Sequence, residues 1–296
     1  MFGKTLKRIA CLALSITGVA ACASSFTACE TSHPQVEMQI EFNEKTYKLE
    51  YELYRKITPA TVNHFLWLVA NKYYDGLCIH DYDDSRMYTG GYSYSSEVSE
   101  NGGLTYKEYY SVIQGYKNYA SFPYSVWRDK EMTTPTYTLC GEFSNNKFTV
   151  GENNKGALKE TFGSLSMYYE SKNVDDEVYV KYQNADKKGE ARRVGYEYNG
   201  ATSLFFISLV EETKTNNSYC TFATLAEDSK KTLESLQSAI ASYIAQNYQD
   251  DEKEFTKYES VRVNTDDPFL AEKSSMAYFY IPNEPITIKK MTVKKY

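Results

Sequence analysis

The stretch at residues 57–91 constrains the fold of this 296-residue chain more than any other part of the sequence. It opens with Thr58, whose hydroxyl can cap a helix, and Pro59, whose missing N–H costs nothing at the first helical position. Apolar side chains then recur at helical spacing at Val62, Phe65, Leu66 and Val69. One face of this helix is therefore apolar, and we expect it to pack against another layer of the fold.

Two short strand-like runs follow this helix. Asn, Asp and Gly break the helical pattern over residues 71–76, and β-type residues dominate at 77–82 and 86–89. Turn-forming residues at 83–85 join the two runs, and a pair of glycines at 90–91 ends the second one. The pattern predicts a buried helix followed by two short strands.

Most of the remaining regular pattern is that of strands. Apolar and polar residues alternate over 36–42 and 47–53 with turn residues at 43–44, which predicts a hairpin with one buried face. A second helix is expected where helical spacing returns, at Leu233, Leu236, Ile240 and Ile244. An alternating run at 286–293 would supply a closing strand. The sequence thus predicts a mainly β fold with two helices.

The N-terminus has the pattern of a bacterial lipoprotein signal. Basic residues precede an apolar run at 9–21 that is too short to span a bilayer as a mature helix. The run ends in Val-Ala-Ala followed by Cys22, which resembles a lipobox, so residues 1–21 would be removed and Cys22 would carry lipid. A competing site at Cys29 has an aromatic residue where the aliphatic one belongs. An ordinary secretory signal or an uncleaved anchor would also place the body outside the cytoplasm.

The small, polar residues 22–35 then read as a tether between the lipid and the folded domain. Lipid attachment would hold the protein on the outer face of the bacterial cell membrane. An extracytoplasmic location permits disulfides, but Cys78, Cys140 and Cys220 lie in apolar, strand-like surroundings and are expected to be buried core residues.

Charge and histidine pattern argue against several classes of function. The net charge of −6 and the lack of a basic stripe argue against a nucleic-acid partner. The three histidines are isolated and no Cys/His spacing indicates a metal site, so neither metal nor cofactor is expected. Tyrosine is abundant, with 29 residues, which suits half-buried strands and peptide-contacting surfaces or reflects a compositional habit of the source genome.

The chain resembles the cyclophilin family of peptidyl-prolyl isomerases. The family motifs "P-x-T-V-x-N-F", "YYDG", "F-H-R" and "Q-G-G-D" have counterparts at 59–65, 73–76, 79–81 and 89–92. Further counterparts, of the motifs "dEF", "G-x-L-S-M" and "N-G-S-Q-F-F-I", lie at 141–143, 163–167 and 199–207.

This resemblance implies a closed antiparallel β-barrel capped by helices, formed by residues 36–296. Additional segments interrupt it near 92–137, 168–198 and 255–282. The charged part of the second addition reads as a solvated loop, with partner binding as the less favoured alternative. The role of the third addition is left open by the sequence.

The resemblance also implies a pocket for a proline ring. Met87 and Phe206 match pocket-floor residues of the family, and His80 matches its strand histidine. We therefore expect these three side chains to contact substrate, namely proline-containing peptide segments.

The catalytic half of the pattern is altered. Asp81 stands at the position of the family's catalytic Arg, and Thr89 and Leu204 replace two Gln residues. Tyr219 replaces a pocket His, and Lys214 stands about where the family has Trp. Reversing the charge at position 81 removes the donor that stabilises the twisted amide.

Arg86, which replaces a pocket Phe, is a possible substitute for the missing cation. It would either pair with Asp81 on an inactive surface or lie over the pocket. The sequence therefore predicts an extracytoplasmic lipoprotein, expected to be a monomer, with an isomerase domain of weak or lost activity that assists the folding of exported proteins. The alternatives are a non-catalytic prolyl-peptide-binding chaperone and a surface interaction protein on the same fold.

Overall fold

The computed structural model describes residues 31–95, 100–116, 119–148, 157–169, 177–181, 190–211, 218–248, 254–264 and 274–296. The expected signal sequence at 1–21, Cys22 and Lys214 lie outside these ranges. At the start of the described chain, the Thr31 N–H donates to the Tyr296 carbonyl at 2.9 Å, so residues just before the first strand already lie against the body. Among the helices in the described ranges, none combines the length and apolar character needed to cross a bilayer.

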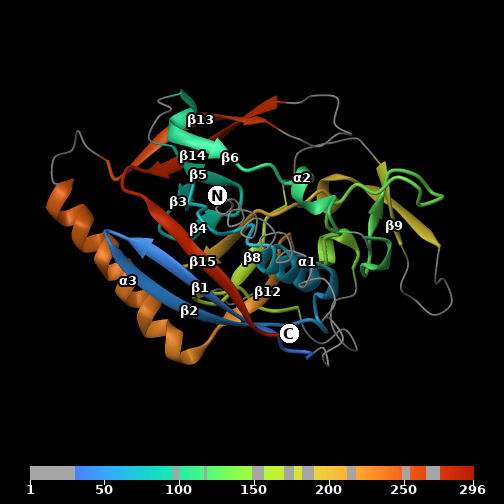
Figure 1. Cartoon of the computed structure of the whole chain (residues 1–296), viewed down its shortest axis with the longest axis horizontal. Helices are drawn as coiled ribbons and strands as arrows, with labels where there is room; N and C mark the ends of the chain where they lie inside the picture. Colours follow the sequence, from blue (N-terminus) through green and yellow to red (C-terminus); the bar gives the residue numbers. More distant parts are fainter. Residues whose placement is uncertain are drawn as a thin grey trace, which may run out of the picture.

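A curled sheet forms the body of the molecule (Figure 1). Its eight strands are β1 Gln35–Phe42, β2 Lys45–Leu53, β3 Asp81–Tyr82, β4 Arg86–Thr89, β8 Leu165–Met167, β11 Phe205–Ser208, β12 Cys220–Leu225 and β15 Ile286–Lys295. They lie in the order β15-β1-β2-β12-β8-β11-β4-β3. The expected first hairpin and closing strand are confirmed as β1–β2 and β15, and the G-x-L-S-M counterpart at 163–167 contains β8.

The two edges of this sheet meet through isolated contacts. The Ile79 N–H donates to the Ile286 carbonyl at 2.8 Å, and Cys78 forms a single bridge with Thr287. No ladder joins β3 to β15 in the described chain, so the barrel is less completely closed than the resemblance implied. The contacts nevertheless bring the chain before β3 against the closing strand.

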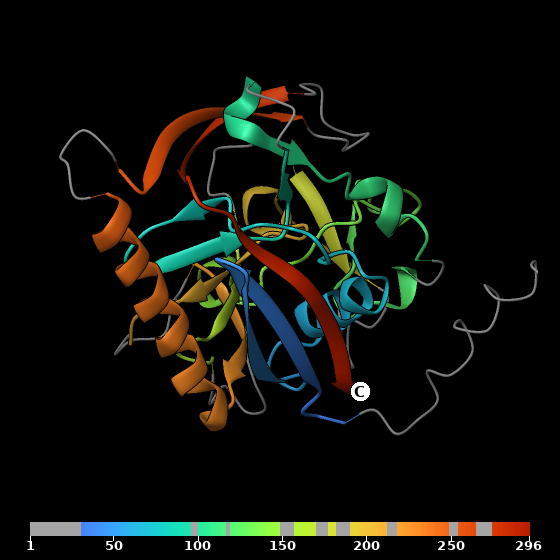
Figure 2. The ribbon, with the colours of Figure 1, turned by 60° about the vertical axis from the view of Figure 1, so that its left-hand side comes forward.

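Helices cover the sheet on its outside and at its end (Figure 2). They are α1 Pro59–Ala70, α2 Tyr110–Ile113 and α3 Glu227–Asn247. Helix α1 packs on β12 and β15, and α3 runs along β2. The two helices expected from the sequence are confirmed as α1 and α3, and the short α2 forms within the first added segment.

The start of α1 is capped by a residue from elsewhere in the chain. Thr58 precedes the helix but makes no capping hydrogen bond with its side chain, contrary to the sequence-based expectation. Instead the Glu142 carboxylate accepts the N–H groups of Ala60 and Thr61 at 3.0 and 2.9 Å and the Thr61 hydroxyl at 2.8 Å. These donors would otherwise be buried without partners.

Aromatic and aliphatic side chains fill the barrel. The Phe65 ring on α1 contacts Phe222 at 4.8 Å and Phe205 at 5.4 Å between centroids, which fixes the helix against β12 and β11. Cys78, Cys140 and Cys220 are buried free thiols, as expected for core residues.

All three added segments contain strands, which are β5 Tyr92–Tyr94, β6 Leu104–Tyr106, β7 Val126–Trp127, β9 Glu177–Lys181, β10 Ala191–Gly195, β13 Thr256–Asn264 and β14 Ser274–Pro282. Strands β10, β9 and β7 form a small sheet, so the charged segment read as a solvated loop is in part a β-hairpin. Its Val178 and Val180 alternate inward and are buried, which stabilises the hairpin on the body.

The third addition forms the β13–β14 hairpin over the end of the barrel (Figure 1). Its inner face buries Val261 and Ile281 against Cys78, Tyr92 and Leu104 in a second hydrophobic cluster. The hairpin is therefore a packed part of the domain, and β14 lies beside β3.

Candidate functional site

The pairing of β4 with β11 decides which side chains can form a site. Phe206 lies opposite Tyr88, and Ile207 lies opposite Met87. Residues directly opposite each other in an antiparallel pair point to the same face of the sheet. Phe206 and Tyr88 therefore share the outer face, whereas Met87 and Ile207 point into the barrel.

The expected pocket floor of Met87 and Phe206 is consequently wrong. Met87 is fully buried in the main core, and Phe206 lies on the other side of the sheet. The side-chain period of a strand is two residues, so a difference of one position in the register reverses the face that a residue occupies.

Aromatic rings surround Phe206 on the outer face. Tyr88 lies at 5.4 Å and Tyr219 at 5.3 Å from the Phe206 ring, measured between centroids. Tyr168 lies 6.0 Å from both tyrosines. Tyr219 is thus at the site as the resemblance implied, whereas Tyr88 and Tyr168 were missed, although the alternation over 86–89 places Tyr88 on the face of Arg86.

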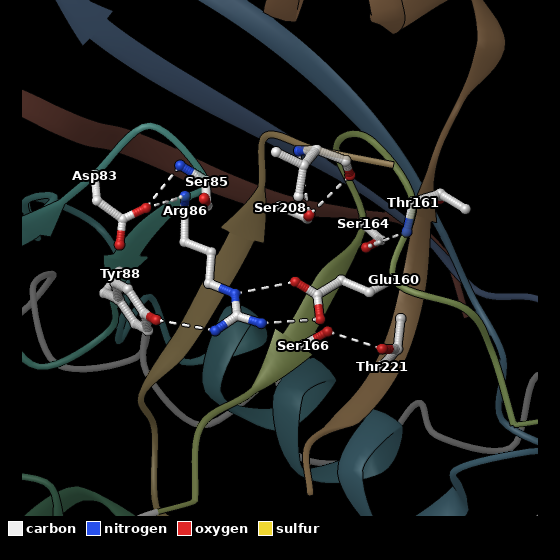
Figure 3. A network of polar contacts seen from close by, with 11 residues as sticks. Asp83, Ser85, Arg86, Tyr88, Glu160, Thr161, Ser164, Ser166, Ser208 and Thr221 are labelled. Atoms are coloured by element: carbon white, nitrogen blue, oxygen red, sulfur yellow. Dashed lines mark hydrogen bonds and ion pairs between the residues drawn. The ribbon is translucent and has the colours of Figure 1, made fainter. Parts of the chain in front are cut away.

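Arg86 extends across this aromatic face. Its guanidinium carbon lies 4.4 Å from the centre of the Phe206 ring and 5.3 Å from that of Tyr219. Its Nε and Nη2 donate to the two carboxylate oxygens of Glu160 at 3.0 and 3.2 Å, and its Nη1 donates to the Tyr88 hydroxyl at 3.3 Å (Figure 3). Arg86 therefore pairs with Glu160, so the hypothesis of an Asp81 pair is wrong, and the alternative position over the aromatic ring is the one observed.

The turn before Arg86 fixes the direction in which its side chain leaves the sheet. The Asp83 carboxylate accepts the backbone N–H groups of Ser85 and Arg86 at 2.7 and 2.8 Å (Figure 3). Glu160 is 1% exposed and Arg86 is 23% exposed, so the ion pair is largely removed from water. A buried, bidentate pair of this kind holds the guanidinium in one geometry.

The consequence is that the Phe206 ring is covered. Phe206 has no exposed surface, because Arg86, Tyr88 and Tyr219 lie against it. A proline ring could reach Phe206 only if Arg86 moved away from Glu160.

Asp81 also points to this outer face, since it lies opposite Tyr88 in the β3–β4 pair. Its Oδ1 accepts the backbone N–H of Tyr280 in β14 at 2.8 Å. Burial raises the pKa of this carboxyl to about 6, against the N–H donors of Tyr280 and Tyr82, which lower it. The residue thus attaches the added hairpin to the barrel, a role that no pattern in the sequence predicts.

Comparison with known proteins decides the family. The family model described as cyclophilin type peptidyl-prolyl cis-trans isomerase/CLD matches residues 37–263. The chain belongs to the cyclophilin family. A search of curated proteins found no match.

Solved cyclophilin structures resemble the chain at low sequence identity. A Cryptosporidium parvum cyclophilin type isomerase is 15% identical with a TM-score of 0.42, and the match covers 89% of this chain and 99% of that chain. The same protein in the presence of the dipeptide Ala-Pro is 15% identical with a TM-score of 0.41, and the match covers 88% of this chain and 99% of that chain. The Mimivirus cyclophilin is 14% identical with a TM-score of 0.42, and the match covers 91% of this chain and 93% of that chain.

The other expected site residues of this cyclophilin domain lie away from the Phe206 ring. His80 is buried between Tyr92 and Phe279 beneath the added hairpin, and burial lowers its pKa to about 3, so it is neutral. Thr89 is buried and donates its hydroxyl to the Cys78 carbonyl at 2.7 Å.

Leu204 and Gly91 fit closely together. A Cβ atom added at Gly91 would lie 2.6 Å from the Leu204 Cδ2, so Leu204 occupies the space that this glycine leaves open. The structure thus brings Arg86, Asp81, Phe206 and Tyr219 to one face of the cyclophilin domain and places Met87, Thr89 and His80 in buried positions.

Glu160 is a further member of the site that the sequence did not predict, besides Tyr88 and Tyr168. It lies 74 residues from Arg86 in the chain and just before the G-x-L-S-M counterpart at 163–167. An isolated Glu next to a Thr in a polar run carries no local signal, so only the fold identifies it as the partner of Arg86.

Proposed function

We propose that this protein is an extracytoplasmic, lipid-anchored cyclophilin that acts on proline-containing segments of exported proteins with low isomerase turnover. The family supports prolyl-peptide handling, and a related cyclophilin was solved in the presence of Ala-Pro. The basic start, short apolar run and Cys22 support lipid attachment. The observation that carries the low turnover is the ion pair of Arg86 and Glu160 over the Phe206 ring.

The chemistry explains why this arrangement gives slow catalysis. Rotation about a prolyl amide has a barrier of about 20 kcal/mol, and an enzyme lowers it by binding the twisted amide better than either planar form. That requires a hydrogen-bond donor near the amide, and the carboxylate of Asp81 accepts hydrogen bonds and is already bound to β14.

Arg86 does not simply replace the missing donor. Its Nε and Nη2 atoms donate to Glu160 and its Nη1 donates to Tyr88. Donation to a peptide would first cost these charge-assisted bonds, which are stronger than neutral ones.

We expect the full chain in detergent micelles to speed cis-trans exchange of a short Ala-Pro peptide only slightly above the uncatalysed rate. The measurement is NMR exchange spectroscopy. A cyclophilin that has an arginine at the position of Asp81 serves as the positive control. Asp81→Arg alone should give little gain, because Arg86 still covers Phe206. The triple variant adds Arg86→Ala, which uncovers Phe206, and Glu160→Gln, which removes the carboxylate that would otherwise be buried without Arg86. This variant should raise the exchange rate by roughly tenfold or more.

Two results would contradict this proposal. One is a wild-type rate equal to that of the control cyclophilin. The other is an unchanged rate in the folded triple variant, which would count against any latent catalytic groove on the outer face.

The anchoring part of the proposal has its own test. Expressed in bacteria with radiolabelled palmitate, the wild-type chain and the Cys29→Ser variant should incorporate label and remain with the membrane. Cys22→Ser should abolish labelling, because its thiol is the proposed attachment point. Equal labelling of all three proteins would rule out Cys22 as the anchor.

A second candidate function is a non-catalytic binder of prolyl peptides or a surface interaction protein on the same fold. The covered Phe206 ring favours it, since binding outside the pocket does not need that ring. Binding to a peptide array without any isomerase rate would select this candidate.

A further inference from the structure

The added hairpin carries a row of exposed aromatic side chains. Tyr258, Tyr278 and Tyr280, here called the tyrosine strip, are 59%, 59% and 49% exposed. The Tyr258 ring stacks on Tyr278 at 5.4 Å and contacts Tyr280 at 4.8 Å. So much exposed aromatic surface in one place is typical of an interaction site.

The strip is held on a rigid support. Tyr258 lies directly opposite Tyr280 in the β13–β14 ladder. Tyr278 lies two residues before Tyr280 on β14 and therefore points to the same face. The alternate residues Val261 and Ile281 point inward and are buried in the second hydrophobic cluster. The outward face therefore projects its rings with little conformational freedom left to lose on binding.

The strip continues into the outer face described above. The Tyr280 N–H donates to Asp81, which lies opposite Tyr88, and the Tyr88 ring contacts Phe206 at 5.4 Å. Figure 1 shows the β13–β14 hairpin at the β3 end of the barrel. An extended chain that crosses the outer face at Tyr88 would meet the tyrosine strip next.

We propose that the tyrosine strip is a second docking subsite for the same proline-containing segment, an inference that rests on the proposed function. Proline-rich segments form a preformed polyproline II helix whose rings pack on aromatic side chains and whose carbonyls remain free to accept hydrogen bonds. Tyrosine supplies both the ring and a hydroxyl donor. The strip holds a substrate by its flanking prolines while the Phe206 ring stays covered.

The charges beside the strip agree with an uncharged peptide as the occupant. Thr256 and Ser260, the neighbours of Tyr258 on the outward face of β13, are uncharged, so no charge lies next to the strip on this strand. An anionic membrane surface or nucleic acid would instead be matched by a cluster of cations.

The test compares a peptide of about six Ala-Pro repeats with a peptide of a single repeat. Binding to the full chain in detergent micelles is followed by fluorescence anisotropy for the long peptide and NMR titration for the short one. We expect the wild type to bind the long peptide at least tenfold more tightly. The combined Tyr258→Ser, Tyr278→Ser and Tyr280→Ser variant should lose this advantage, and the matched control Tyr296→Ser, at another exposed tyrosine, should retain it.

A photo-crosslinking long peptide gives a second readout on the unaltered protein, with crosslinks expected in β13 and β14. The inference would be overturned if the strip variant still bound the long peptide at least tenfold more tightly than the short one, or if crosslinks formed only in other elements. The proposed function would remain in place in either case. Binding of a soluble peptidoglycan glycan at the strip, without peptide, would assign it to carbohydrate instead. Failure of both peptides to bind the wild type would reject the proposed function and this inference with it.

Discussion

Replacing Arg86 by methionine is expected to lower the free energy of unfolding by about 3 kcal/mol. Glu160 is 1% exposed, and both of its carboxylate oxygens accept from the Arg86 guanidinium. Methionine fills similar space but leaves the carboxylate charge without that cation, and a buried charge separated from its counter-ion is strongly destabilising. Urea unfolding followed by tyrosine fluorescence measures the effect.

Two further variants show that the ion pair is the cause. The double substitution of Arg86 and Glu160 by methionine should recover most of the loss, because it removes the buried charge as well. Arg193→Met breaks the exposed pair of Arg193 with Glu177 and should cost under about 0.5 kcal/mol. If Arg86→Met were as mild as Arg193→Met, the ion pair would not hold the outer face in place.

The second large effect is expected at the start of α1. Glu142→Ala should lower the free energy of unfolding by about 2–3 kcal/mol, because the N–H groups of Ala60 and Thr61 would be left buried without an acceptor. Thr58→Val should cost under about 1 kcal/mol, since the Thr58 hydroxyl does not cap the helix. Equal losses at the two positions would contradict the capping role of Glu142.

Glu142 also gives this prediction a pH dependence. Burial raises the pKa of its carboxyl from an ordinary value of 4.5 to about 7, against the lowering effect of the Thr61 and Ala60 N–H groups. The folded protein therefore binds this proton more tightly than the unfolded chain, so the contribution to stability is greatest below pH 4.5 and falls as the pH rises to about 7. Glu142→Gln should remove this part of the pH dependence in unfolding experiments at pH 5 and pH 8.

The sequence was most informative where the pattern is local. Helix α1, the β1–β2 hairpin and β15 follow from residues whose spacing directly reports helix or strand, and their bounds are close to those expected. The motifs at 59–92 and 163–207 also identified the family, because they occur in the order of its elements.

The structure of the added segments was harder to predict from the sequence, since no family pattern applied to them. The β9–β10 and β13–β14 hairpins form because alternate residues find apolar cover on the body, such as Val180 in one and Ile281 in the other. Because the sequence does not reveal this cover, it predicted a solvated loop for the charged part of the second addition and left the third addition open.

By itself, then, the sequence determined the fold family, the main helices and strands, and the absence of an arginine at position 81. Only the tertiary structure decided that Glu160 pairs with Arg86 and that Glu142 caps α1, because both partners come from far along the chain. It also decided that Met87 faces the core and Phe206 the outer surface. Strand register sets those faces, and register depends on pairing between distant segments, which local spacing does not encode.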